Sequence, residues 1–122
     1  MDSRQRGKRA VDNLYYYCAR VTKVYDGDTI TVDIDLGFHV GLTSEKIRLY
    51  RINTPEVRGY EREQGIVSRD WLRQRILGKE IILRTYRDKK GKYGRWLADV
   101  LIDGVCINDE MVEQGLAAYH DY

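Results

Sequence analysis

Three short segments of this 122-residue chain carry side chains that could act together on a phosphodiester. They are Asp26-Gly27-Asp28-Thr29, Thr54-Pro55-Glu56 and Tyr93-Gly94-Arg95, and Arg48 lies shortly before the second. Two carboxylates could hold a hard divalent cation, a further carboxylate could take a proton from water, and two guanidiniums could hold a phosphate. The combination predicts phosphodiester hydrolysis.

Asp26 and Asp28 stand one residue apart on a glycine turn. This arrangement concentrates negative charge where a cation would offset it, and oxygen ligands favour calcium or magnesium. Asp-Gly-Asp is also typical of an ordinary hairpin turn, so the motif alone leaves a structural role open.

The order and spacing of these segments resemble the staphylococcal (thermo)nuclease family from about Val21 to Ala117. Asp-Gly-Asp-Thr, Arg-Leu followed by Thr-Pro-Glu, Tyr-Gly-Arg and a helical segment from Asn108 to Leu116 occur in the family's order. The resemblance implies a calcium-dependent phosphodiesterase, a thermonuclease-type endonuclease. Such an enzyme would cut DNA and RNA with little sequence specificity and leave 3′-phosphate products.

The resemblance assigns catalysis to Arg48, Glu56 and Arg95. Glu56 would act as the general base, and Pro55 holds it on a stiff stem because proline fixes its own backbone angle. Arg48 and Arg95 would stabilise the charge that develops on phosphorus oxygens. Taken singly, each of these residues could equally be a surface charge or half of an ion pair.

The resemblance also assigns metal ligation, to Asp28, to the backbone carbonyl of Thr54 and to position 53, with Asp26 as a supporting carboxylate. The family has a carboxylate at position 53, but here it is Asn53. An amide oxygen can still bind a hard cation, and the loss of one negative charge predicts weaker calcium binding. The expected cofactor is Ca²⁺, with Mg²⁺ or Mn²⁺ as alternatives.

Four further residues resemble nucleic-acid contacts of the family: Lys92, Tyr93, Tyr119 and Tyr122. Lys92 and Tyr93 would contact a terminal phosphate, and the two later tyrosines would stack on a base. The tyrosines could instead cap the barrel, and the charged loop around residue 92 could simply be a solvated hairpin.

The elements that position these side chains can be inferred from hydrophobic periodicity. Ile30, Val32 and Ile34 alternate with polar residues, which indicates a half-buried strand over residues 29–35. Further elements are expected as strands over 21–25, 46–52, 80–86 and 96–102, a helix over 67–76 ended by Gly78, and a helix from Asn108 as N-cap to Gly115. This mainly β pattern with added helices (α+β) predicts a five-stranded OB-fold barrel. One helix would lie between strands 3 and 4, and a short helix near the C-terminus.

The charges are segregated along the chain. Residues 46–95 carry fifteen Lys/Arg against six acids, whereas residues 96–122 carry six acids and no Lys or Arg. A strongly basic segment fits a polyanionic partner such as DNA or RNA. A soluble basic surface would be the simpler reading if no motif accompanied it.

The organisation predicts a mobile basic N-terminal arm over residues 1–13 and a single nuclease-like OB-fold domain over residues 14–122. No signal peptide or membrane-length apolar stretch is evident, so we expect a cytoplasmic protein with no membrane partner. Cys18 and Cys106 are expected to be buried free thiols. The chain stops before a C-terminal helix found in the best-known family member, so a monomer and a homodimer are both compatible with it.

Two rival functions remain at this level. The chain could be a catalytically weak or inactive nuclease-like OB-fold module that only binds nucleic acid, as Asn53 would favour. It could also be a protein-interaction domain whose basic face docks an acidic partner. The presence of Arg48, Glu56 and Arg95 favours the enzyme.

Overall fold

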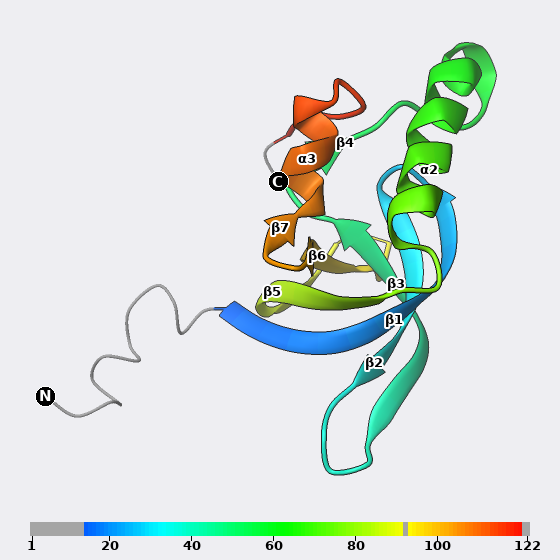
Figure 1. Cartoon of the computed structure of the whole chain (residues 1–122). Coiled ribbons are helices and arrows are strands. Elements are labelled where there is room, and N and C mark those ends of the chain that lie inside the picture. Colours follow the sequence, from blue (N-terminus) through cyan, green and yellow to red (C-terminus); the bar gives the residue numbers. More distant parts are fainter. Residues whose placement is uncertain (1–13, 92, 121–122) are drawn as a thin grey trace, which may run out of the picture.

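The computed structural model describes residues 14–91 and 93–120. Its strands are β1 (Leu14–Asp26), β2 (Thr29–Asp35), β3 (Gly41–Leu49), β4 (Ile52–Asn53), β5 (Glu80–Lys90), β6 (Trp96–Ile102), β7 (Val105–Cys106) and β8 (Ala118–Tyr119). Its helices are the 3₁₀ turn η2 (Gly59–Glu61), α2 (Arg62–Ile76) and α3 (Ile107–Glu113). Figure 1 shows α2 and α3 at one end of the strand layer and the β2–β3 hairpin at the other.

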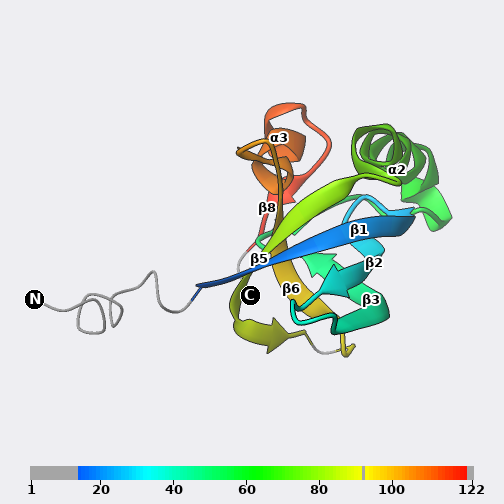
Figure 2. The same cartoon turned by 60° about the horizontal axis from the view of Figure 1, so that its bottom comes forward.

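The strands form a closed barrel. The sheet order is β3-β2-β1-β5-β6-β7, and a parallel pairing between β3 and β6 joins the two sides (Figure 2). The ring therefore contains β1, β2, β3, β5 and β6, while β4 and β8 form a separate two-stranded sheet. The expected OB-type barrel is confirmed, with α2 between the third and fourth barrel strands and α3 near the C-terminus.

Hydrophobic alternation accounts for the best-predicted strand. β2 spans residues 29–35 as expected, and Ile30, Val32 and Ile34 are buried in the core. β1 and β3 are longer than expected, because β1 also pairs with β5 along Leu14–Arg20 and β3 pairs with β2 from Gly41 onward.

The two helices end at the glycines that the sequence indicated. α2 packs the fully buried Leu72 and Ile76 on the barrel and ends before Gly78, whose φ of 76° is the left-handed conformation expected of a residue just past a helix. Gly115 likewise ends α3: its N–H donates to the Val112 carbonyl, and the Leu116 N–H donates to the Met111 carbonyl, a Schellman motif.

The expectation that Asn108 caps α3 is wrong. The helix begins at Ile107, and Cys106 precedes it without a side-chain cap. The Asn108 side chain is fully buried; it accepts a hydrogen bond from the Val100 N–H and donates to the Tyr50 carbonyl. A buried amide that satisfies backbone groups of two segments ties α3 to β6 and to the turn after β3.

A buried carboxylate, Asp99, organises the same region. Arg84 donates to its Oδ2 at 2.8 Å and Arg51 to its Oδ1 at 3.2 Å, while the Asn108 amide also donates to Oδ1. Arg51 has a φ of 70°, a strained value for a residue other than glycine. The anchored guanidinium holds this turn, which leads directly into Asn53.

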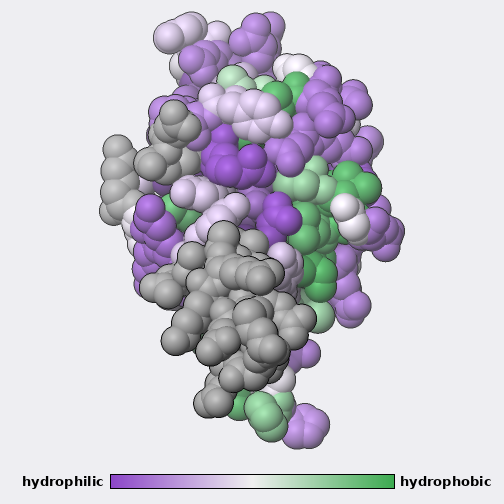
Figure 3. Space-filling view, turned by 90° about the vertical axis from the view of Figure 1, so that its left-hand side faces the viewer, coloured by the Kyte–Doolittle hydropathy of each residue, from purple (hydrophilic) through white to green (hydrophobic). Residues whose placement is uncertain are grey.

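The surface is largely polar. The face in Figure 3 is mostly hydrophilic, with apolar side chains gathered along its right-hand side and a few more at its lower end, where the β2–β3 hairpin lies. Both cysteines are free, as expected, but neither is buried: Cys18 is exposed because it lies on the outward side of β1, and Cys106 is partly exposed. Within residues 14–91 and 93–120, no helix is long and apolar enough to cross a membrane.

Candidate active site

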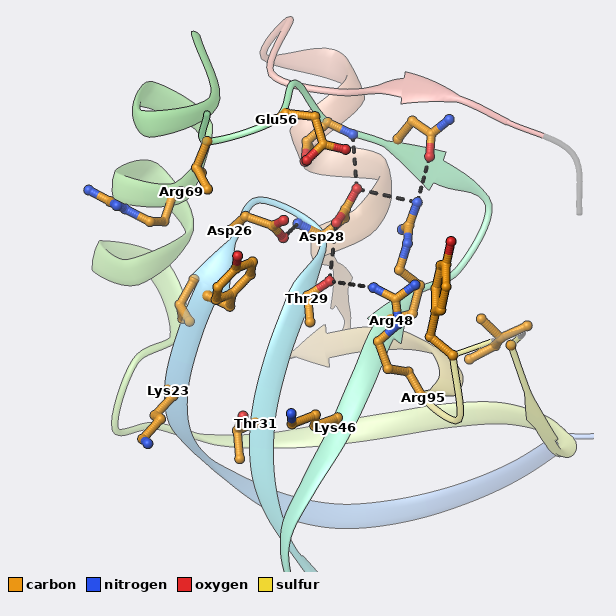
Figure 4. A pocket seen from close by; sticks show the side chains of 18 of the residues that line it. Lys23, Asp26, Asp28, Thr29, Thr31, Lys46, Arg48, Glu56, Arg69 and Arg95 are labelled. Carbon is orange, nitrogen blue, oxygen red and sulfur yellow. Dashed lines mark hydrogen bonds and ion pairs between the residues drawn. The ribbon is translucent and has the colours of Figure 1, made fainter. Parts of the chain in front are cut away.

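One open groove contains most of the side chains that the sequence singled out. Its lining includes every predicted catalytic and metal-site residue together with one predicted nucleic-acid contact: Asp26, Asp28, Arg48, Asn53, Thr54, Glu56, Tyr93 and Arg95 (Figure 4). Lys92 and Tyr122 lie outside the described residues. Tyr119 does not line the groove; its hydroxyl donates to Asp109, so its stacking role stays a prediction.

The turn between β1 and β2 holds the two carboxylates. The Asp26 side chain accepts a hydrogen bond from the Asp28 N–H at 3.0 Å, which closes the turn locally. Gly27 is required there, because a Cβ would lie 2.8 Å from the Thr54 side chain. This close approach brings the segment after β4 against the Asp26–Asp28 turn.

Arg48 is the centre of the polar network. Its backbone pairs with Thr29 across β2 and β3, and its side chain is buried beside the turn. One guanidinium nitrogen lies 3.3 Å from the Asp28 carboxylate and also donates to the Asn53 amide oxygen. The other donates to the Leu49 carbonyl at 2.7 Å. The Thr54 N–H donates to Asp28 as well, so three segments meet at this carboxylate.

Arg95 joins the same network because the pairing of β3 with β6, which closes the barrel, brings it close to Thr29. It directly precedes β6, whose parallel pairing with β3 places Leu97 opposite Arg48. Arg95 donates to the Thr29 hydroxyl at 3.0 Å, and that hydroxyl donates to Asp28 at 3.3 Å. The Arg95 guanidinium also lies 5.2 Å from the centre of the Tyr93 ring. Thr29 thus bridges a predicted catalytic residue and a predicted metal ligand, a role that the sequence reasoning missed.

Burial beside a second acid perturbs the ionisation of Asp26. Removal from solvent, followed by the negative charge of Asp28, raises the pKa of Asp26 to about 7. Arg48 opposes this shift only in part. The ionised pair is therefore under electrostatic stress that a bound cation would relieve.

Glu56 lies on the rim, in the segment between β4 and η2, above the two aspartates in Figure 4. Its side chain is exposed, and its N–H donates to the Glu61 carboxylate at 3.0 Å. Gly65 of α2 packs so closely that a Cβ would lie 2.1 Å from the Glu56 carbonyl oxygen. The sequence reasoning missed Gly65 because the expected helix began at residue 67, whereas α2 begins at Arg62. An isolated glycine inside a longer helical pattern would have been a signal of close packing.

Comparison with known proteins agrees with this geometry. A family model described as staphylococcal nuclease homologue matches residues 46–122. The chain belongs to this nuclease family. It is 31% identical to the thermonuclease of Staphylococcus intermedius over 104 residues, covering 80% of this chain and 56% of that protein.

Two other relatives match similar shares of this nuclease-family chain. An uncharacterized endonuclease of Haemophilus influenzae is 38% identical over 104 residues, covering 84% of this chain and 53% of that protein. An uncharacterized protein of Methanocaldococcus jannaschii is 27% identical over 132 residues, covering 88% and 61%. The chain thus spans about half to three-fifths of the length of these relatives.

The likeness to thermonucleases implies a divalent cation at the β1–β2 turn, and the side chains present fit one. Two carboxylates and the Asn53 amide form an oxygen-only donor set of the kind that calcium and magnesium prefer. The Thr54 hydroxyl is buried beside this turn without a hydrogen-bond partner in the described structure. No group of three His, Cys, Asp or Glu side chains suited to a metal occurs in residues 14–91 and 93–120. The number of negatively charged side chains at the site is therefore low for binding a divalent cation.

Proposed function

We propose that this chain is a metal-dependent nuclease domain that hydrolyses phosphodiester bonds of DNA and RNA with little sequence specificity. Family membership supports the reaction class. The observation that carries the proposal is the continuous contact from Arg95 through Thr29 to Asp28 and on to Arg48, at the floor of a groove with Glu56 on its rim. Carboxylates and guanidiniums meet there at hydrogen-bond distance, where a phosphate and a cation could be held together.

In the proposed reaction, Arg48 and Arg95 hold the oxygens of the scissile phosphate and stabilise the added negative charge as phosphorus is attacked. Glu56 accepts a proton from the attacking water, whose oxygen forms the new bond to phosphorus. The bond from phosphorus to the 5′ oxygen breaks in line, and the departing oxygen takes a proton from solvent water, which leaves a 3′ phosphate and a 5′ hydroxyl. Asp28, Asn53 and the backbone carbonyl of Thr54, with Asp26 as a supporting carboxylate, would hold Ca²⁺, which when bound neutralises phosphate charge and lowers the pKa of water.

In this scheme the Arg48 guanidinium must bind both the substrate phosphate and the side chains that it already contacts. In the described structure its guanidinium contacts Asp28 and Asn53. A phosphate must compete with both for this donor, so binding of substrate and rearrangement of Arg48 are linked. Arg95 contacts a neutral hydroxyl, so a phosphate has a weaker interaction to displace at Arg95 than at Arg48.

The second candidate function is a nucleic-acid-binding module with little or no catalysis. Asn53 favours it, because the site has one negative charge fewer than three carboxylates would supply. A basic groove binds phosphates whether or not cleavage follows.

The test uses single- and double-stranded DNA and RNA, incubated with the chain in calcium, magnesium, manganese or a chelator. We expect metal-dependent cleavage that falls at least about 100-fold in Glu56→Gln and Arg95→Ala, because general base catalysis and charge stabilisation each contribute this much. Glu63→Gln, an exposed glutamate on α2 outside the groove lining, is the matched control. Intact substrate in every metal would overturn the enzyme, and equal cleavage by the variants would overturn the assignment of roles.

A further inference from the structure

A row of three polar side chains crosses the barrel surface next to the candidate active site. Lys23 of β1 pairs with Thr31 of β2, and Thr31 pairs with Lys46 of β3. All three line the same groove as the carboxylates. Figure 4 shows them side by side across the three strands, below Asp28 and Arg48.

The spacing of this row follows from the register of the sheet. Thr29 pairs with Arg48, and Thr31 pairs with Lys46 two residues farther along both strands. Residues two apart on a strand face the same side, and the rise over two residues is about 7 Å. The row therefore lies about 7 Å along the groove from Arg48, which is proposed to hold the scissile phosphate. This separation is of the order of the distance between neighbouring phosphates in an extended nucleic-acid strand.

The two lysines are better placed to bind an anion than Arg69 and Arg73 of α2, which also line the groove. Arg69 pairs with Asp70 at 3.0 Å, and Arg73 donates to the Val24 carbonyl. Lys23 and Lys46 are both exposed, and neither takes part in an ion pair recorded within the described residues.

The acids near this row are already engaged. Glu45, next to Lys46, accepts a hydrogen bond from the Trp96 indole at 3.0 Å. Asp33, the next same-face position after Thr31 on β2, accepts one from the Ser44 N–H at 2.9 Å. Neither carboxylate forms an ion pair with Lys23 or Lys46 within the described residues. Each lysine ammonium has three N–H donors on a flexible stem, which suits a phosphate.

We propose that Lys23, Thr31 and Lys46 form a second phosphate subsite, which holds the phosphodiester adjacent to the one being cut. The proposal rests on the proposed function, because the adjacent phosphate is defined relative to the one held by Arg48. The ligand class is a single strand with at least two successive phosphates. A substrate with one phosphate cannot occupy both positions.

The experiment compares Lys23→Gln/Lys46→Gln with the charge-matched control Arg62→Gln/Lys79→Gln, whose positions are exposed and outside the groove lining. Binding of a fluorescent single-stranded oligodeoxynucleotide is measured by anisotropy in chelator over a salt series. We expect the groove variant to bind several-fold more weakly, with a salt slope lower by about 0.7 for each phosphate that the variant no longer neutralises. The control should match the unmodified chain.

Cleavage gives the second readout. The groove variant should raise KM several-fold for an oligonucleotide with kcat unchanged, and should leave KM unchanged for a substrate with one phosphodiester and no other phosphate. An equal loss in the control pair, or an equal KM change on the one-phosphate substrate, overturns the subsite. Salt-dependent binding without any cleavage overturns only the proposed function, whereas absence of salt-dependent binding overturns the subsite.

Discussion

The close contact between α2 and the Glu56 segment allows a sharp test of how Glu56, the proposed general base, is positioned. In Gly65→Ala the new Cβ would lie 2.1 Å from the Glu56 carbonyl oxygen and 2.9 Å from the Pro55 carbonyl oxygen. Both neighbours are backbone atoms, so no side-chain rotation relieves the contact. The segment has to move by about 1 Å to restore an ordinary van der Waals distance, a displacement that can cost about 100-fold in rate.

The same substitution should change stability much less than activity. Alanine favours the helix by about 1 kcal/mol over glycine, and overpacking costs about 1–3 kcal/mol. These effects oppose each other, so we expect a net loss of stability of at most about 2 kcal/mol. Asp26 and Asp28, which carry the negative charge of the proposed calcium site, lie on the β1–β2 turn and not on this segment, so calcium affinity should fall much less than kcat.

Steady-state cleavage, calcium titration calorimetry and urea unfolding would be measured on Gly65→Ala beside Gln64→Ala, an exposed neighbour on α2. We expect kcat to fall about 100-fold only in the glycine variant. In a Glu56→Gln background, Gly65→Ala should add almost nothing, because both changes act on one group. Full kcat in Gly65→Ala, or an additive loss in the double variant, would refute the reasoning.

Three other changes test the surrounding chemistry. Asn53→Asp should raise calcium affinity by about an order of magnitude in a calorimetric titration, because it restores one negative charge; equal affinities would end the idea. The pKa of Asp26 is raised to about 7, above that of an unfolded aspartate, so metal-free stability should fall by about 2–4 kcal/mol as pH rises from 4 to 8. Asp26→Asn should flatten this dependence in urea unfolding, and an unchanged pH profile would exclude it. Asp99→Asn weakens the ion pairs to Arg51 and Arg84 and should cost about 3 kcal/mol by the same measurement, whereas a loss below about 1 kcal/mol would show that the network is dispensable.

The sequence predicted the barrel because its strands have strong local signals. Strict alternation over residues 29–35 and the glycines after both helices give elements whose type and ends agree with the structure. The longer extents of β1 and β3 had no such signal, because they depend on pairing with β5 and β2, which periodicity within one segment cannot show.

The candidate site was predictable in composition but not in its contacts. Motif spacing identified Asp28, Arg48 and Arg95, and the groove brings them together. Thr29 was missed as a bridge because its role depends on the parallel pairing of β3 with β6, which joins residues far apart in sequence. Asn108 was misassigned for a related reason: an asparagine near a helix start is a common cap, and only tertiary burial turns it inward.

Two features that local sequence preferences disfavour, buried acids and a glycine inside a helix, lie around one groove. Their position bears on the choice between an enzyme and a binding module. Two neighbouring acids are buried together, and a glycine inside α2 packs against the Glu56 backbone. A module that only binds phosphates would gain nothing from Asp26 and Asp28 beside its arginines, since they repel the ligand and hold Arg48 away from it. A site that must hold a cation and a phosphate together needs both signs of charge within hydrogen-bond distance, and local conflicts of this kind are expected at functional sites.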